Sequence, residues 1–144
     1  MSDPLYRKEL LRLAADATGA GRLPSACFTG QAFNPTCGDR VTIDIALEEN
    51  RIAGIAHATK ACVLTQASAA ILGAELVGFS RDEVLQLREK VADMLGGGDR
   101  PDAPFDAFGA FDGVVPHANR HNCVLLPLDA VLAAFDASDA RKPG

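Results

Sequence analysis

The sequence lacks the segments that would direct it to a membrane or to nucleic acid. No run of about 18 apolar residues occurs in its 144 residues, so no transmembrane helix is expected. Residues 1–17 carry charges through the stretch that a signal peptide would keep apolar. The net charge is −5, and the sequence contains no cluster of Lys and Arg. We therefore expect a cytoplasmic protein with no nucleic-acid or membrane partner.

The sequence also lacks a phosphate-binding loop, and it contains four cysteines. The glycine-rich GGGDR at residues 96–100 lacks the Lys-Ser/Thr that completes a P-loop. The four cysteines are Cys27, Cys37, Cys62 and Cys123. Disulfides are rare in a reducing compartment, so metal binding or thiol chemistry is the expected role of any cysteine that carries function. The alternative for each is a small buried apolar residue.

What is present fits one core of ordinary size. At 144 residues and 48% hydrophobic, the chain predicts a single domain over residues 1–144. Asp3 and Pro4 open a helix that runs to the glycines at 19–21. Alternating apolar residues at 41–47 and a second β-prone stretch at 51–59 predict a hairpin, and 26–33 predicts a third strand.

From Cys62 the apolar spacing becomes helical, which predicts helices in the second half of the chain. The first stripe is Val63, Ala67, Ala70, Ile71, Ala74 and Val77. A capping box of Ser80 and Glu83 opens another helix, which the glycines at 96–98 end. Three phenylalanines in 99–120 indicate a partly helical segment against the core. The last helix starts near Cys123, and its Pro127 is tolerable only in the first turn.

Three cysteines fall at the ends of these predicted elements. Cys37 precedes a strand, and Cys62 and Cys123 lie at helix starts, where the helix dipole stabilises a thiolate. Asp39 shares a side with Cys37 in an extended chain, because alternate residues face the same way. Cys37, Asp39, Cys62 and Cys123 thus form a candidate tetrahedral site for zinc or iron.

Three motifs resemble those of the U-type iron–sulfur cluster assembly scaffolds, the IscU/NifU/SufU family. They are NPTCGD at 34–39, CVLTQASAAILGAELVG from Cys62, and RHNCVLLPLDAV from Arg120. The long interval between Cys62 and Cys123 is similar to the SufU branch, which also has an arginine at the position of Arg120. The resemblance implies an α+β fold of the SufE/NifU-like class, with a three-stranded antiparallel sheet covered by about five helices.

The resemblance also implies an activity and a set of site residues. Cys37, Asp39, Cys62 and Cys123 would bind zinc, or the three cysteines a transient iron–sulfur cluster, and Gly38 would let the backbone turn beneath the metal. The protein would be a sulfur-transfer scaffold rather than a conventional turnover enzyme. Cys37 would accept sulfane sulfur from a cysteine desulfurase, with Cys123 as second candidate, and cluster acceptor proteins would follow downstream. Lys60 and Arg120 would offset the negative charge of the site.

The sequence departs from the family pattern at three places. Ala61 replaces the glycine that usually precedes the second cysteine, and Asn122 replaces the histidine that precedes the third in IscU. The His-Tyr and Asn-Pro-Arg pattern near the N-terminus is missing. These departures keep open an alternative, a non-catalytic protein that a metal stabilises and that regulates a desulfurase. A thiol peroxidase or protease is disfavoured, because no His and acid are placed beside a nucleophile.

The remaining chemical side chains are expected to lie outside the site. His57 and His117 are interpreted as surface or half-buried histidines, and Cys27 as a buried or incidental thiol. His121 neighbours Cys123, so a role in metal binding or proton transfer stays open for it.

Overall fold

The computed structural model describes residues 8–24, 27–35 and 38–140. Its elements follow the order α1 (Lys8–Asp16), β1 (Phe28–Asn34), β2 (Asp39–Glu48), β3 (Arg51–Lys60), α2 (Val63–Glu75), α3 (Arg81–Leu95), the 3₁₀ helices η2 (Asp106–Val114) and η3 (Ala118–Arg120), and α4 (His121–Ala140). The three strands form one antiparallel sheet in the order β1-β2-β3. The predicted α+β class and the three-stranded sheet are confirmed.

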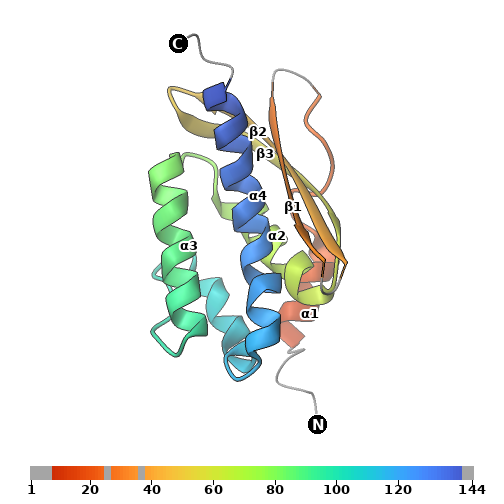
Figure 1. The fold of residues 1–144 in the computed structure, drawn as a ribbon, viewed down its shortest axis with the longest axis vertical. Coiled ribbons are helices and arrows are strands. Elements are labelled where there is room, and N and C mark those ends of the chain that lie inside the picture. The colour runs from red at the N-terminus through yellow and green to blue at the C-terminus, as the bar shows by residue number, and fades with distance from the viewer. Residues whose placement is uncertain (1–7, 25–26, 36–37, 141–144) are drawn as a thin grey trace.

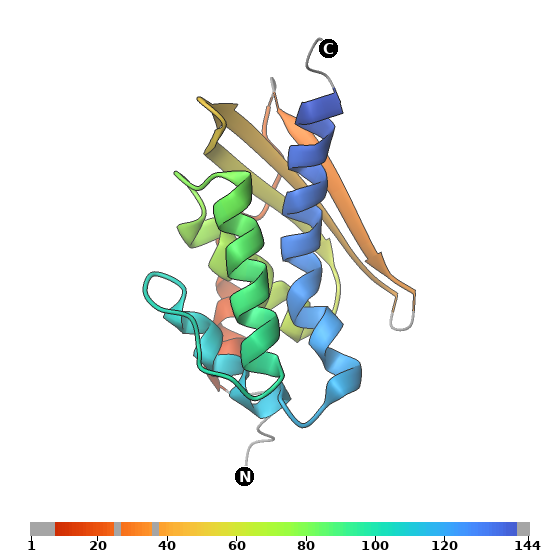
Figure 2. The same ribbon diagram turned by 60° about the vertical axis from the view of Figure 1, so that its left-hand side comes forward.

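Helices cover one face of the sheet (Figures 1 and 2). Helix α4 packs on β1 and β2, α2 packs on β3, and α3 lies beside α4. The strands turn Val41, Ile43 and Ile45 toward these helices, and all three are fully buried. This alternation is the physical basis of the predicted hairpin, because a strand with one covered face buries every second residue. No helix in the described ranges is long and apolar enough to cross a membrane.

Helix α3 begins and ends as the sequence predicts. Ser80 and Glu83 form both halves of the capping box, and the helix ends at Leu95 before Gly96. The segment that follows is partly helical, with Phe105, Phe108 and Phe111 buried in the core. Helix α1 begins at Lys8, and the predicted start at Asp3 and Pro4 lies outside the described residues.

Two predictions about the helices were wrong. Ala67, Ala70 and Ile71 of the predicted stripe are buried, but Val77 lies beyond the end of α2 at Glu75 and is exposed. Pro127 lies in the second turn of α4, not the first. Proline has no N–H, so it removes the intrahelical donor that the carbonyl of Cys123 would otherwise have.

Gly30 of β1 allows α4 to approach the sheet closely. A Cβ atom added at Gly30 would lie 2.2 Å from the carbonyl oxygen of Ala130 and 2.2 Å from the backbone nitrogen of Ala134. Backbone atoms cannot move aside as a flexible side chain can. The close contact between β1 and α4 therefore requires glycine at this position.

We predict that Gly30→Ala lowers the free energy of unfolding by about 3 kcal/mol or more, because the new methyl group overlaps the backbone of α4. Gly54→Ala is the matched control, since its Cβ would meet the Cβ of Ala46 at an ordinary 3.8 Å. That variant should change the stability by less than about 1 kcal/mol. Urea unfolding of both variants measures the difference, and equal stabilities would contradict this account of the packing.

His57 is buried in β3, contrary to the expectation of a surface or half-buried residue. The segment before β1 covers it: the backbone of His57 bonds Gly19 and Gly21, and its Nε2 donates to the carbonyl of Thr18 at 3.0 Å. Its Nδ1 accepts from the hydroxyl of Thr59 at 2.9 Å. Burial lowers the pKa of His57, and the bond to Thr18 opposes this in part. The imidazole is therefore held neutral.

We predict that this neutral histidine makes the fold sensitive to mild acid. The unfolded chain binds a proton at His57 near pH 6.5, whereas the folded chain resists it, so the free energy of unfolding falls as the pH drops below about 6.5. The slope from one group stays under about 1.4 kcal/mol per pH unit. Unfolding measured from pH 7.5 to 5 should show a shallower slope for His57→Gln than for wild type. His117→Gln, at an exposed position, is the control and should keep the wild-type slope.

Candidate metal centre

Three of the four predicted ligands come together at the ends of three elements. Asp39 is the first residue of β2, Cys62 is the N-cap of α2, and Cys123 lies in the first turn of α4. One ligand atom from each lies within 4.8 Å of the others. The fourth predicted ligand, Cys37, lies outside the described residues. The structure thus brings together residues that are 23 and 61 positions apart in the sequence.

The carboxylate of Asp39 is fixed by donors from α2. Its Oδ1 accepts the backbone N–H of Cys62 at 3.1 Å, and its Oδ2 accepts the hydroxyl of Thr65 at 2.9 Å. The Sγ of Cys62 lies 3.3 Å from the same Oδ2. Cys62 makes no side-chain cap of its own helix, so Asp39 supplies the acceptor that the N-terminus of α2 requires. The helix dipole favours an anion at this place.

Hydrogen bonding favours deprotonation of Cys62 in spite of its burial. Cys123 is fully buried and Cys62 is half-buried. A hydrogen bond from Cys123 is the main cause that lowers the pKa of Cys62 to about 6. Desolvation opposes it, bonds from the side chain and backbone of Thr65 lower the pKa further, and the bond with Asp39 raises it. Cys62 therefore reaches the thiolate form more easily than an ordinary cysteine, and the thiolate is the form that binds metal or attacks sulfur.

The donor set fits zinc or iron. Ligand atoms around a tetrahedral zinc ion with sulfur donors lie roughly 3.5 Å apart, close to the separation of Cys62 Sγ and Asp39 Oδ2. Thiolate donors favour zinc and iron–sulfur chemistry over magnesium or calcium. Three donors from a strand and two helices would hold the ion, and Cys37 precedes Asp39 by two residues.

Gly38 lies at the turn that leads into β2, and this position favours glycine because of its backbone conformation rather than because of crowding. Its φ is +73°, and its N–H donates to the carbonyl of Asn34 at 2.8 Å. A Cβ added there would meet none of the described atoms within 4 Å. The need for glycine therefore comes from the left-handed backbone, which L-residues rarely adopt.

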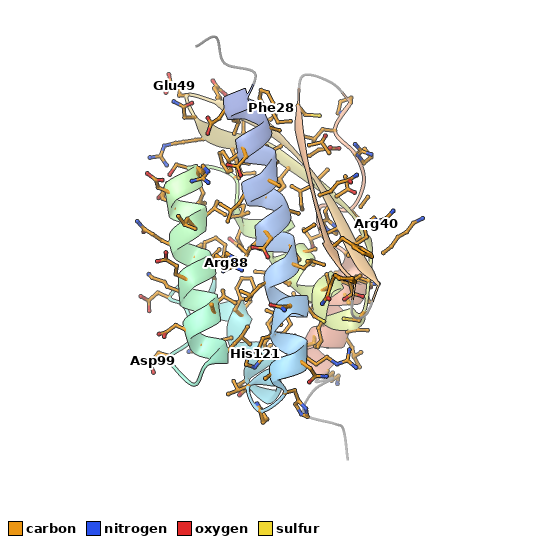
Figure 3. All side chains as sticks on the ribbon, in the orientation of Figure 1. Phe28, Arg40, Glu49, Arg88, Asp99 and His121 are labelled. Atoms are coloured by element: carbon orange, nitrogen blue, oxygen red, sulfur yellow. The ribbon has the colours of Figure 1, made fainter. Side chains whose placement is uncertain are left out.

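The two predicted charge-balancing residues lie in different settings. Arg120 is half-buried in η3, directly before α4, and Lys60 is exposed at the end of β3. Lys60 pairs in register with Arg40, whose guanidinium lies 5.4 Å from the ring centroid of Phe33. Phe33 is 54% exposed, and Arg40 projects from the sheet on the side away from α4 (Figure 3). Phe33, Arg40 and Lys60 thus form a row of one aromatic and two cationic side chains across the sheet, next to Asp39. The charge roles themselves stay predictions.

The remaining candidates lie apart from the three-residue cluster. Nε2 of His121 donates to the carbonyl of Val115 at 2.9 Å, so this nitrogen already has a partner, and Asn122 is exposed. Cys27 is a half-buried free thiol before β1. Ala61 does not have a positive φ, and it therefore does not need the conformation reserved for glycine. Replacing the family glycine at this position causes no backbone strain.

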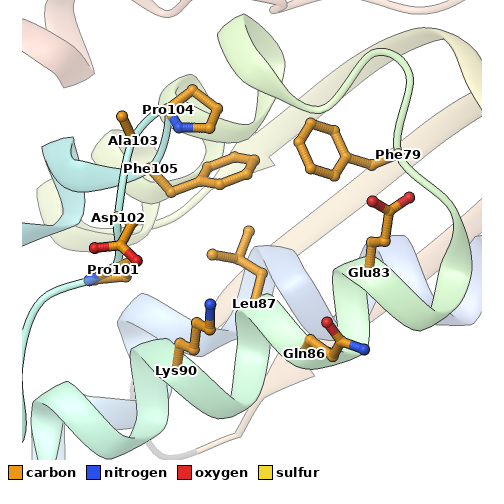
Figure 4. A pocket seen from close by; sticks show the side chains of 10 residues that line it. All are labelled: Phe79, Glu83, Gln86, Leu87, Lys90, Pro101, Asp102, Ala103, Pro104 and Phe105. Atoms are coloured by element: carbon orange, nitrogen blue, oxygen red, sulfur yellow. The ribbon is translucent and has the colours of Figure 1, made fainter.

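A separate cavity of about 160 Å³ lies between α3 and the segment that leads to η2. Figure 4 shows Phe79 and Phe105 on one side of it and Leu87 and Lys90 on the other. Neither cysteine nor histidine lines this cavity. It is therefore distinct from the candidate metal centre.

Comparisons with known proteins assign the family. The family model described as the NifU-like N terminal domain matches residues 5–137. The chain belongs to the NifU-like N-terminal domain family. A NifU-like protein (N-terminal) from Brucella abortus has the same fold, with a TM-score of 0.90 and 27% identity over 97% of this chain and 98% of that one. A putative SUF-system scaffold from Fervidobacterium islandicum AW-1, at 21% identity and a TM-score of 0.83, shares the fold over 94% of this chain and 99% of its own.

Two curated relatives carry names that refer to iron–sulfur cluster assembly. The scaffold protein IscU of Streptococcus pyogenes serotype M1 is 28% identical over 75% of this NifU-like domain and 69% of its own length. IscU 1 of Archaeoglobus fulgidus is 35% identical over 65% of this chain and 61% of its own. The predicted family resemblance is thereby confirmed.

Sequence reasoning missed Thr65, which contacts both Asp39 and Cys62. It also missed Ser68, whose hydroxyl donates to the carbonyl of Val124 at 2.7 Å and ties α2 to α4 beside Cys123. Both are polar residues in a mostly apolar helix, one turn or two after Cys62. Buried polar groups require partners, so their presence there was the available signal.

We predict that this NifU-like domain is stabilised by one bound zinc ion, because its ligands join a strand to two helices. Zinc at roughly a thousand times its Kd adds about 4 kcal/mol, which raises the Tm by roughly 10 °C. Thermal melts with and without a strong chelator measure this. Cys62→Ser should lose the difference and Cys27→Ser should keep it. Coincident melting curves for zinc-loaded and chelated wild type would contradict the prediction.

Proposed function

We propose that this chain is a scaffold for iron–sulfur cluster assembly that receives sulfur from a cysteine desulfurase. Cys37, Asp39, Cys62 and Cys123 would bind zinc or hold a transient iron–sulfur cluster. The observation that carries the proposal is the gathering of two thiols and a carboxylate within 4.8 Å at the ends of β2, α2 and α4. Family membership and the names of the relatives support the same assignment.

Sulfur transfer needs a thiolate and no outside oxidant. The acceptor thiolate attacks the terminal sulfur of the persulfide that the desulfurase carries, and a new sulfur–sulfur bond forms. The sulfur–sulfur bond of the donor breaks, and its electron pair leaves with the cysteine thiolate of the desulfurase. The acceptor then carries the persulfide, so the numbers of atoms and electrons balance.

Burial discriminates between the candidate acceptors. Cys123 lies in the first turn of α4 and has no exposed surface, so a partner's persulfide cannot reach it without movement of that helix. Cys62 is partly exposed but bonded to Asp39, Thr65 and Cys123. We therefore propose Cys37 as the acceptor and leave Cys123 second. Cys62, Cys123 and Asp39 would keep hold of the ion while Cys37 reacts, and bound zinc would keep the thiols deprotonated at neutral pH.

A second candidate function is that of a regulator that binds a desulfurase without accepting sulfur. The observation that favours it is Asn122, exposed where IscU has a histidine before its last cysteine. The decisive experiment supplies ³⁵S-cysteine and a PLP-dependent desulfurase, then separates the proteins without reductant. A scaffold gains reductant-labile label, and Cys37→Ser reduces that label to background. An unlabelled wild-type chain would establish the regulator and contradict the proposed transfer.

We predict that Asp39→Ala separates metal retention from sulfur transfer. Three thiolates suffice to retain zinc through dialysis, but the carboxylate is the harder and more easily exchanged ligand. Without it, Cys37 becomes one of only three protein ligands and leaves the ion less readily, so transfer should slow by roughly tenfold or more. Zinc content after dialysis and the rate of label transfer are measured on the same preparations.

The matched control for that comparison is Asp44→Ala. Asp44 is a carboxylate on the same strand, bound by Arg22 and Thr29 on the opposite face of the sheet. The Asp44→Ala variant should transfer sulfur at the wild-type rate at temperatures where it is folded. If Asp39→Ala transferred sulfur as fast as wild type, the carboxylate would have a structural role only.

A further inference from the structure

Thr65 presents a buried hydroxyl to two of the candidate ligands at once. The residue is fully buried in the first turn of α2. Its Oγ1 lies 2.9 Å from Oδ2 of Asp39 and 3.5 Å from Sγ of Cys62. With the 3.3 Å contact between that sulfur and the same oxygen, the three side chains form a closed triangle.

This use of the hydroxyl is not what a helical threonine ordinarily does. In a helix, a Thr hydroxyl commonly bonds the carbonyl three or four residues before it. For Thr65 the carbonyl four residues earlier is that of Ala61, and it accepts the side-chain amide of Gln66 at 2.8 Å. The hydroxyl of Thr65 is turned instead toward a carboxylate from another strand. The local helix therefore does not explain its position.

We propose that Thr65 is a positioning residue for the metal centre, whose hydroxyl fixes the carboxylate of Asp39 beside Cys62 and Cys123. The inference rests on the proposed function, in which Asp39 is a ligand. A carboxylate oxygen accepts more than one bond, so Oδ2 can keep the bond from Thr65 and still face an ion. The backbone N–H of Cys62 donates to Oδ1, so both oxygens of the Asp39 carboxylate are held and its plane is fixed.

The expected effect is on metal affinity through Asp39. Hydrogen-bond partners of metal ligands typically contribute a factor of 10 to 100 to affinity. Because Thr65 acts through the carboxylate, its loss cannot cost more than the loss of Asp39 itself. We expect Thr65→Val, which keeps the shape of the side chain and removes the hydroxyl, to weaken zinc binding by about tenfold. Thr65→Ser should restore wild-type affinity.

The experiment is competition for zinc between the full-length chain and a chromophoric chelator, at a temperature well below the Tm of every variant. Ser138→Ala is the matched control, since it removes a buried hydroxyl that bonds the backbone carbonyl of Phe135 near the other end of α4. It should leave zinc affinity unchanged. If Thr65→Val does not fold, Thr65→Ala takes its place.

A double-mutant cycle tests whether the effect passes through Asp39. In the Asp39→Ala background, Thr65→Val should change zinc affinity by less than about twofold, because the carboxylate that it positions is gone. An undiminished effect there, an equal loss in Ser138→Ala, or unchanged affinity in Thr65→Val would each overturn the inference while leaving zinc binding intact. A wild-type chain that binds zinc with no dependence on Cys62 or Asp39 would overturn the proposed centre and this inference together.

Discussion

The carboxylate of Asp39 at the N-terminus of α2 is the interaction on which the candidate site depends. Asp39 is the first residue of β2, yet its carboxylate accepts the N–H of Cys62, the helix N-cap 23 residues later, and the hydroxyl of Thr65 in the first turn of α2. An unpaired N–H at a buried helix start would be costly, so the strand and the helix are held in one register by this bond. The same bond places the carboxylate next to two thiols. The carboxylate that caps α2 is therefore also the candidate metal ligand.

The third element reaches this place because α4 lies close against the sheet. Gly30 removes the side chain that would separate β1 from α4, and Ser68 fixes α2 to the carbonyl of Val124. Cys123 precedes that carbonyl by one residue and is buried in the first turn of α4. Pro127 lies inside this helix and has no N–H to donate to the carbonyl of Cys123. The helix that carries the third thiol is thus positioned by packing rather than by its own start signal.

The elements and the candidate ligands could be predicted, because they depend on patterns within a few residues. Alternation at 41–47 gave the strand, and the capping box of Ser80 gave the start of α3. The partners of the ligands were not predictable in the same way. Thr65 was missed because its role depends on Asp39, 26 residues away, and the burial of His57 was missed because the covering segment near Gly19 has no regular pattern. Local propensity carries no information about such long-range contacts.

The most direct test of the central claim is the coordination shell of the zinc-loaded protein, measured by X-ray absorption at the zinc edge. The account predicts about three sulfur ligands near 2.3 Å and one light ligand near 2.0 Å. The same measurement on Asp39→Asn should show a changed light-ligand shell with the sulfur shell retained. A wild-type shell made only of nitrogen and oxygen, or a light-ligand shell identical in the variant, would contradict the assignment of Asp39, Cys62 and Cys123 as a metal centre.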